Sequence, residues 1–369
     1  MKVLHLHKLT GVGGSERHLL TLLPALRERG VDAAFLGLDV PGSDAARFYR
    51  ELDAPSLHVR CGADLSPRMA RDVARAVRAA RPDLVHAHLV HADVYGAMAS
   101  LLAGVPLVST RHNDDRYLLG PFRYVDRLFA RRARRLVAIS DAVRRFLVAA
   151  GHPAYKIETI HYGLDEAPQA PSEVTPEAAG IPADAPLVLA IGRLTAQKDH
   201  ATLLRAFALA RERHPDAVLA ILGVGPLEAE TRALASELGL DGAVLLPGRI
   251  EPGDWLERAS VFAHSSRWEG FGIVLLEAML AALPVAATRV SAVPEIVSDG
   301  ETGLLAEPGD WRALGQALDS LLADRERARA FGEAGRVRAR EEFSVARMAD
   351  RTVELYERAS SQAASSPAA

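Results

Sequence analysis

The segment 269–277 carries two glutamates on either side of a glycine-containing turn, Glu269-Gly-Phe-Gly-Ile-Val-Leu-Leu-Glu277. Glu277 lies eight residues after Glu269, within an apolar stretch typical of a buried helix. Eight residues are close to two helical turns, so Glu277 shares a face with the turn that precedes the helix. A carboxylate in such surroundings is costly to bury unless it has a partner. The pattern indicates a binding site, and the structural alternative is a buried glutamate satisfied by local N–H groups.

The start of the same helix offers backbone donors. The first N–H groups of a helix have no partner within the helix, and the helix dipole favours negative charge beside them. We therefore expect an anion to be bound by the amides of this turn, which belong to Gly270, Phe271, Gly272, Ile273 and Val274.

A second candidate site is the loop Gly192-Arg193-Leu-Thr-Ala-Gln-Lys198-Asp199, which follows an apolar run at 187–191. A guanidinium and an ammonium five positions apart on such a loop could clamp a diphosphate. Only four of the 44 basic residues are lysines, which marks Lys198 as a position where a compact point charge could be required; retention of four lysines by chance is the alternative. A surface loop with two solvated cations is the alternative.

A glycine-rich segment, Gly11-Val-Gly-Gly-Ser-Glu16, separates the first apolar run from a helical pattern. Glycines at this place let backbone N–H groups approach a phosphate at a helix N-terminus. The segment is not a dinucleotide-binding fingerprint, because G-x-G-x-x-G would require glycine where Glu16 stands. A plain strand-to-helix turn at Gly13 and Gly14 is the alternative.

Short apolar runs alternate with helical patterns in both halves of the chain, which predicts parallel α/β sheets covered on both faces. Expected strands lie at 3–6, 33–38, 84–87, 107–109 and 136–139, and then at 187–191, 218–222, 244–246, 261–263 and 285–287. Expected helices include 16–29, 69–80, 200–213, 227–238 and 273–281.

This alternation predicts two Rossmann-like domains, 1–165 and 187–343, joined by a proline-rich linker at 166–186. We expect a C-terminal helix at 344–358 to pack back on the first domain and a disordered tail at 360–369. In doubly wound sheets ligands bind beyond the carboxyl ends of the strands, so the ligand is expected in a crevice shared by the two domains.

The composition is that of a soluble protein, with 49% hydrophobic and 25% charged residues. Cys61 is the single cysteine, which excludes an intramolecular disulfide and fits a reducing cytoplasm. No signal peptide follows Lys2, and the longest apolar stretch, 272–288, contains Glu277 and Pro284. We therefore expect a cytoplasmic protein without a membrane span.

The charge is unevenly distributed. Residues 1–165 hold 24 Lys+Arg and 17 Asp+Glu, a net charge of +7, whereas the rest hold 20 and 30, a net charge of −10. The excess is concentrated in the Arg123–Arg145 region, where aromatic residues are interspersed. Such a region could rest on an anionic membrane at its inner face or hold an anionic, lipid-linked acceptor; a solvated helix face is the alternative. The arginines are Arg123, Arg127, Arg131, Arg132, Arg134, Arg135, Arg144 and Arg145.

The segment 269–277 resembles the Glu-x7-Glu motif of retaining glycosyltransferases of family 4, which have the GT-B fold of two Rossmann-like domains. The resemblance covers nearly the whole chain. Its other motifs, in the family's order, are Gly13-Gly14, Ile139-Ser140-Asp141-Ala142, His161-Tyr-Gly-Leu-Asp165, Gly192-Arg193-Leu194 with Lys198, Pro247-Gly248-Arg249, and Pro294-Glu295-Ile296-Val297 with Gly300 and Gly303-Leu304.

The resemblance implies a role for each matching residue. Arg193 and Lys198 would bind the donor diphosphate, Glu269 the transferred sugar, and Glu277 the ribose. Gly13 and Gly14 would approach the diphosphate from the first domain, and Arg249 would border the base. His112, in Thr110-Arg-His-Asn113, matches a first-domain histidine near the sugar, although a lone histidine is more often structural. His86 and His88 end a strand at the same crevice and rank lower.

The resemblance also implies a reaction that retains the configuration at the anomeric carbon, with a nucleotide diphosphate sugar as donor substrate and no cofactor. Many related enzymes hold a divalent metal with Asp-x-Asp, which occurs nowhere in this sequence. Cationic side chains and a helix N-terminus would then stabilise the leaving diphosphate, so we expect a metal-independent reaction.

Other classes remain open from the sequence alone. A nucleotide-sugar epimerase, hydrolase or phosphorylase shares the architecture, although a phosphorylase would need a cofactor-binding lysine. A non-catalytic sugar-nucleotide-binding subunit is disfavoured by the presence together of Glu269, Glu277, Arg193 and Lys198. A nicotinamide-dependent oxidoreductase is disfavoured by the incomplete glycine fingerprint. Polysaccharide or glycolipid assembly in the cell envelope is the expected process, and no nucleic-acid partner is expected.

Overall fold

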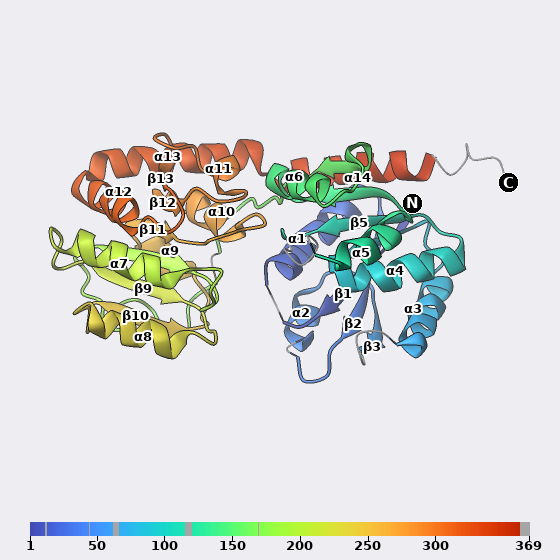
Figure 1. Ribbon diagram of the computed structural model, residues 1–369, viewed down its shortest axis with the longest axis horizontal. Helices are drawn as coiled ribbons and strands as arrows, with labels where there is room; N and C mark the ends of the chain where they lie inside the picture. The colour runs from blue at the N-terminus through green and yellow to red at the C-terminus, as the bar shows by residue number, and fades with distance from the viewer. Residues whose placement is uncertain (12, 44, 62–65, 115–119, 169, 362–369) are drawn as a thin grey trace. The chain divides into compact units, whose positions relative to one another are not determined.

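The computed structural model describes the chain except residues 12, 44, 62–65, 115–119, 169 and 362–369 (Figure 1). The chain forms two compact units. The first comprises residues 1–163 and the C-terminal segment from Val345, and the second comprises Leu164–Ser344. Each is a parallel sheet flanked by helices, as the alternating pattern predicts.

The sheet of the first unit has seven strands in the order β3-β2-β1-β4-β5-β6-β7. The order reverses between β1 and β4, as in doubly wound folds. The strands are β1 Lys2–Leu9, β2 Asp32–Asp39, β3 Ser56–Arg60, β4 Leu84–His88, β5 Leu107–Arg111, β6 Ala133–Ala138 and β7 Ile157–Thr159. The helices are α1 Gly14–Glu28, α2 Ala45–Glu51, α3 Pro67–Ala80, α4 Leu89–Ala103, α5 Phe122–Ala130, α6 Asp141–Ala149 and α14 Val345–Ser361.

The sheet of the second unit has six strands in the order β10-β9-β8-β11-β12-β13, with the reversal between β8 and β11. The strands are β8 Leu187–Ile191, β9 Val218–Leu222, β10 Val244–Gly248, β11 Val261–His264, β12 Val285–Thr288 and β13 Gly303–Ala306. The helices are α7 His200–Arg211, α8 Glu228–Glu237, α9 Gly253–Arg258, α10 Ile273–Leu280, α11 Val293–Ile296, α12 Trp311–Ala323 and α13 Arg325–Glu342.

The C-terminal helix α14 belongs to the first unit (Figure 1), where it packs on α1. Met348, Leu355 and Tyr356 are buried in the same core as Val3 and Leu19. The helix extends through Ser361, so the first two residues of the expected tail at 360–369 are helical. Residues 362–369 lie outside the described part of the chain.

The proline-rich stretch 166–186 belongs to the second unit and packs against α9. Ser172 N donates to Asp254 Oδ2 at 2.8 Å, and Trp255 Nε1 donates to the Val174 carbonyl at 2.9 Å. Arg258 donates to the carbonyls of Pro182, Ala183 and Ala185. These bonds give an irregular segment a fixed course because they satisfy its backbone groups without regular secondary structure.

Among the described residues, no helix combines the length and the apolar character needed to cross a membrane.

Candidate active site

The second unit places both of its predicted loops at the point where the strand order reverses. The loop carrying Arg193 and Lys198 follows β8, and the loop carrying Glu269 follows β11, the neighbour of β8 on the other side of the reversal. Adjacent loops leave such a sheet in opposite directions at this point, which opens a crevice for a ligand. The topology therefore brings two segments 71 residues apart to one place.

Lys198 and Glu269 form a partly shielded ion pair. Lys198 Nζ lies 2.5 Å from Glu269 Oε2, and the two side chains are 14% and 12% exposed. Glu269 Oε2 also lies 3.2 Å from His264 Nε2 and accepts from Ser266 Oγ at 3.3 Å. Burial alone would raise the pKa of Glu269, but Lys198 and His264 outweigh it and hold that pKa well below its usual range. The carboxylate is therefore ionised and able to accept hydrogen bonds from hydroxyl groups.

Bonds between the two loops hold Lys198 in position. Ser265 Oγ donates to the Lys198 carbonyl at 2.7 Å, and Arg267 Nε lies 2.9 Å from Asp199 Oδ2. Asp199 has a φ of 46°, a left-handed conformation that costs free energy and requires surrounding support. The loops are therefore tied together at Lys198 and at Asp199, so little reordering is needed to place the ammonium group.

Two glycines that the sequence analysis did not select, Gly223 and Gly225, allow the loop after β9 to lie close to the loop after β8. A Cβ atom on Gly223 would lie 2.1 Å from the Gly192 carbonyl oxygen, and one on Gly225 would lie 2.3 Å from the Leu194 carbonyl oxygen. Gly223 also has a φ of 151°, which side-chain-bearing residues rarely adopt. The loops after β8 and β9 can therefore lie against each other only with glycine at these positions.

Glu269 lies on the loop before α10 and is paired with Lys198, whereas Glu277 lies within the helix and is buried. Gly272, with a φ of 93°, turns the chain into α10, and Ile273 and Val274 form its first turn. Glu277 lies on α10 and is 1% exposed, while Phe271 beside the turn is buried against Phe343. The helix start is thus held by its aromatic neighbour.

Two other predicted residues of the second unit, Arg193 and Arg249, are open to solvent. Arg193 is exposed, and its carbonyl accepts a hydrogen bond from His200 Nε2 at 3.2 Å. Arg249 is exposed directly after β10. The structure brings Lys198 and Glu269 into contact, whereas Arg193 and Arg249 are exposed on the loops after β8 and β10.

His264 is a site residue that the sequence analysis missed. It ends β11, is 4% exposed, and contacts both Glu269 and Ser266. Burial lowers its pKa, although Glu269 opposes this effect. The available signal was the polar run His264-Ser265-Ser266 directly after an apolar strand, at the carboxyl edge where ligands bind.

In the first unit, the glycine segment starts α1, and Glu16 forms one half of a capping box there, because Gly13 has no side chain to bond the Glu16 amide. Gly14 is the first helical residue, and the amide of Gly13 donates to Glu16 Oε2 at 3.0 Å. Glu16 is 5% exposed and lies 3.3 Å from His7 Nε2. The chain's own carboxylate therefore occupies the Gly13 amide, which explains why Glu16 stands where a dinucleotide fingerprint has glycine.

His112 lies just after β5 and contacts two other polar residues. Its Nε2 is 3.0 Å from His88 Nδ1, and its Nδ1 is hydrogen-bonded to the Tyr162 hydroxyl. The preceding residue, Arg111, is buried between Asp93 and Asp126 at 2.6 and 2.9 Å. This buried network, which the sequence analysis missed, joins α4 and α5 to the end of β5.

The arginines between 123 and 145 do not form one face. Arg134 and Arg135 lie in β6 and are half-buried, and Arg134 donates to the Ala359 carbonyl at 2.9 Å. Arg127 donates to the Ala150 carbonyl at 2.7 Å. The expectation of a single basic face is wrong because a strand separates α5 from α6; Arg131 and Arg132, at the end of α5, are exposed.

Two sheets of Rossmann type in tandem, each with polar residues at its reversal point, define the class of two-domain α/β proteins to which GT-B enzymes belong. Comparison with known proteins gives the family. Residues 12–167 match the model described as Glycosyltransferase Family 4, and residues 172–338 match that described as Glycosyl transferases group 1.

Two curated relatives match most of the chain. The alpha-maltose-1-phosphate synthase of Mycolicibacterium smegmatis is 31% identical over 94% of this chain and 96% of its own. The D-inositol 3-phosphate glycosyltransferase of an Arthrobacter species is 31% identical over 76% of this chain and 72% of its own. The crystal structure of HepE from Anabaena in complex with UDP and glucose has a TM-score of 0.83 at 23% identity, covering 97% of this chain and 99% of HepE. The chain belongs to glycosyltransferase family 4 and has the GT-B fold.

Proposed function

We propose that the protein transfers a hexosyl group from a nucleoside diphosphate sugar to an acceptor with retention of configuration at the anomeric carbon and without a metal ion. The observation that carries the proposal is the contact between Lys198 and Glu269 at the reversal point of the second sheet. The HepE complex with UDP and glucose supports a nucleotide-sugar donor, since that protein has the same fold.

The physical chemistry of the pair suits a leaving diphosphate. Negative charge grows on the diphosphate as the glycosidic bond breaks, and a cation fixed beforehand stabilises that charge most in the transition state. Lys198 would supply this cation, with Arg193 extending from the same loop. Glu269 would accept hydrogen bonds from the hydroxyls of the transferred sugar, and the buried Glu277 would hold the ribose.

Independence of metal rests on the donor set. The sequence lacks Asp-x-Asp, while the loop after β8 supplies two cations and the first turn of α10 supplies backbone amides. These groups can neutralise a diphosphate without the oxygen-rich ligands that magnesium prefers.

We further propose that the acceptor is anionic. Each of the two curated relatives is named after a phosphate ester, maltose 1-phosphate for one and inositol 3-phosphate for the other. Residues 1–165 carry a net charge of +7, from 24 Lys+Arg and 17 Asp+Glu, which would attract such an acceptor. Assembly of a polysaccharide or glycolipid is the wider process we propose.

A surface of α4 and α5 favours an acceptor that is linked to lipid. The helices contact each other and expose Leu101, Leu102, Tyr124 and Leu128 at 66%, 52%, 61% and 61%. The exposed Arg131 and Arg132 follow α5 directly, and the Arg132 guanidinium donates to the Ser100 carbonyl of α4 at 3.3 Å. Apolar side chains beside arginines are the composition of an interfacial surface on an anionic membrane.

Incubation with a panel of nucleoside diphosphate sugars, with and without phosphorylated acceptors, tests the proposal. Release of free nucleoside diphosphate that depends on the acceptor, together with a glycosylated product, is the expected result. Acceptor-independent release would indicate a hydrolase or an epimerase instead, and nucleotide binding without turnover would indicate a non-catalytic subunit.

A further inference from the structure

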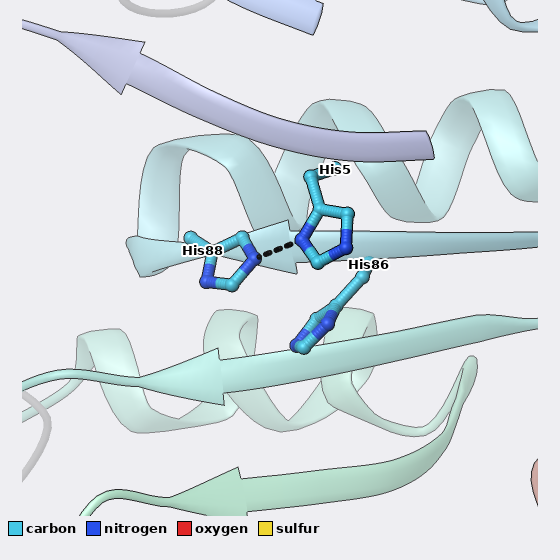
Figure 2. Close-up of side chains that lie close together, drawn as sticks. All are labelled: His5, His86 and His88. Atoms are coloured by element: carbon cyan, nitrogen blue, oxygen red, sulfur yellow. Dashed lines mark hydrogen bonds between the residues drawn. The ribbon is translucent and has the colours of Figure 1, made fainter. Parts of the chain in front are cut away.

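A group of histidines fills the interior of the first unit at the reversal point of its sheet. His5 lies on β1, and His86 and His88 lie on β4, the adjacent strand (Figure 2). Their side chains are directed toward one another, and all three residues are at most 1% exposed. Buried imidazoles need hydrogen-bond partners, and here they provide them largely for one another.

The hydrogen bonds form one continuous series from Thr110 to Tyr162. The Thr110 hydroxyl is 2.7 Å from His86 Nε2, and His86 Nδ1 is 2.6 Å from the Tyr356 hydroxyl. That hydroxyl is 3.3 Å from His5 Nε2. The series continues from His5 Nδ1 to His88 Nε2 at 3.0 Å, from His88 Nδ1 to His112 Nε2 at 3.0 Å, and from His112 Nδ1 to the Tyr162 hydroxyl.

The series constrains where the protons are. A neutral imidazole has one N–H donor and one acceptor nitrogen. At the contact between His5 and His88, one nitrogen must donate and the other accept, since two lone pairs or two N–H groups would otherwise face each other at 3.0 Å. The same holds at the next contact. The Tyr356 hydroxyl has one proton and is hydrogen-bonded to His86 Nδ1 and His5 Nε2, so it donates to one of these rings and accepts from the other. All four histidines must therefore carry the proton on Nδ1, or all four on Nε2.

The histidines meet the condition of neutrality. Burial lowers the pKa of His5 to about 3 and holds those of His86, His88 and His112 well below the usual range, with neighbouring histidines adding to the effect for the latter three. At neutral pH each ring then has a single proton to place.

A metal ion is the competing explanation, because nitrogens of His5, His86 and His88 lie within 4.8 Å of one another. Both His86 nitrogens already have hydroxyl partners, and the three rings bring no negative charge. A buried dication there would be uncompensated, and binding it would disrupt the continuous series. The hydrogen-bonded arrangement satisfies every ring nitrogen of the four histidines.

We propose that Thr110, His86, Tyr356, His5 and His88 act as one tautomer-coupled series that fixes which ring nitrogen of His112 carries its proton. Tyr356 and His88 are then positioning residues, and α14, the last helix of the chain, contributes to the orientation of a ring just after β5. An effect of the series on sugar transfer rests on the proposed function, in which His112 lies beside the transferred sugar. The shared tautomer of the four histidines does not depend on that function.

Nitrogen-15 NMR of the histidine-labelled protein tests the series directly, since protonated and unprotonated ring nitrogens have well-separated shifts. The expected spectrum at neutral pH shows His5, His86, His88 and His112 in one common tautomer. A mixture of Nδ1-H and Nε2-H forms among these four would overturn the proposal. So would zinc binding by the unaltered protein that is lost on changing His5→Gln or His88→Gln.

Tyr356→Phe removes the hydroxyl that joins His86 to His5. We expect His88 and His112 to lose the single-tautomer pattern although neither contacts Tyr356, and kcat for transfer to fall without a matching rise in donor KM. Tyr95→Phe is the control, because Tyr95 is a buried tyrosine whose hydroxyl accepts from the Ser66 amide, away from the series. An unchanged His112 signal in folded Tyr356→Phe protein would refute the coupling. Because the spectrum needs no substrate, its outcome is independent of whether the proposed function holds.

Discussion

Lys198 Nζ lies 2.5 Å from Glu269 Oε2, although the two residues come from loops after different strands. The pair is largely shielded from water, so each charge depends on the other more than an exposed pair would. This contact places the only lysine of the second unit beside a carboxylate whose pKa burial alone would raise.

Removal of the ammonium group should act on catalysis. Lys198→Ala is expected to lower turnover by about 10²- to 10³-fold, the usual effect of deleting one preorganised charge contact. The circular dichroism spectrum should remain that of the folded protein, because the loop is also held by Ser265 and Arg267. Lys156→Ala is the matched control, since Lys156 is a partly buried lysine that donates only to backbone carbonyls of the first unit. Near-normal turnover in Lys198→Ala would argue against the assignment.

The two glutamates should differ in function. Glu269→Gln keeps the shape but removes the charge that faces Lys198, so it should mainly impair sugar transfer. Glu277→Gln, within α10, should mainly weaken binding of the nucleotide. Calorimetric titration of both variants with the free nucleoside diphosphate measures the difference, and equal losses of affinity would contradict this division.

The buried histidines predict acid sensitivity of the first unit. Burial lowers the pKa of His5 and of His18 to about 3, whereas a histidine in an unfolded chain has a pKa of about 6.5. Between these values the unfolded state binds more protons, so stability is complete above about pH 6.5 and falls as the pH is lowered, by about 1.4 kcal/mol per pH unit for each such histidine.

The three tryptophans provide an internal control for that experiment, because Trp255, Trp268 and Trp311 all lie in the second unit. Far-ultraviolet circular dichroism should report loss of structure in mild acid before the tryptophan fluorescence changes. His18→Phe should reduce the steepness by about one proton, whereas His58→Gln, at an exposed position, should not. A pH-independent stability between pH 7 and pH 5 would show that these imidazoles are not buried as neutral groups.

The surface of α4 and α5 should bind anionic vesicles. Each basic residue near an anionic surface contributes about 1 kcal/mol, so Arg131→Ser with Arg132→Ser should weaken sedimentation with anionic vesicles by about 30-fold. Arg325→Ser with Arg329→Ser on α13, where both arginines are exposed, is the matched control. Equal sedimentation by the two double variants, or no sedimentation by the unaltered protein, would show that this surface does not bind an anionic membrane.

Much of the fold could be predicted from the sequence because its buried parallel strands are continuous apolar runs. The predicted 187–191 and 218–222 are the observed β8 and β9. Strand β3 was missed because Ser56–Arg60 is largely exposed and has no apolar run. Strand β7 was missed because Ile157–Thr159 has a single apolar residue, and β13, Gly303–Ala306, was missed although β11 and β12 are equally short.

The site was predictable where charge and glycine stand out in the sequence, and not where the chemistry depends on distant residues meeting. Lys198 and Glu269 were selected individually, but their contact depends on the order of β8 and β11. His5 and Tyr356 gave no signal, because they are 351 residues apart and each looks like an ordinary core position. Arg134 and Arg135 were misassigned to a basic face because a basic composition does not distinguish a helix face from a strand.

The proposed metal-independent, retaining transfer can be tested by the configuration of the product formed in excess EDTA. We expect transfer from an α-linked nucleoside diphosphate sugar to proceed at an unchanged rate in the chelator, and proton NMR of the first product formed to show an α-linkage. Loss of activity in EDTA with recovery on adding magnesium or manganese would show that a metal ion takes part, and a β-linked product would show that the configuration is inverted.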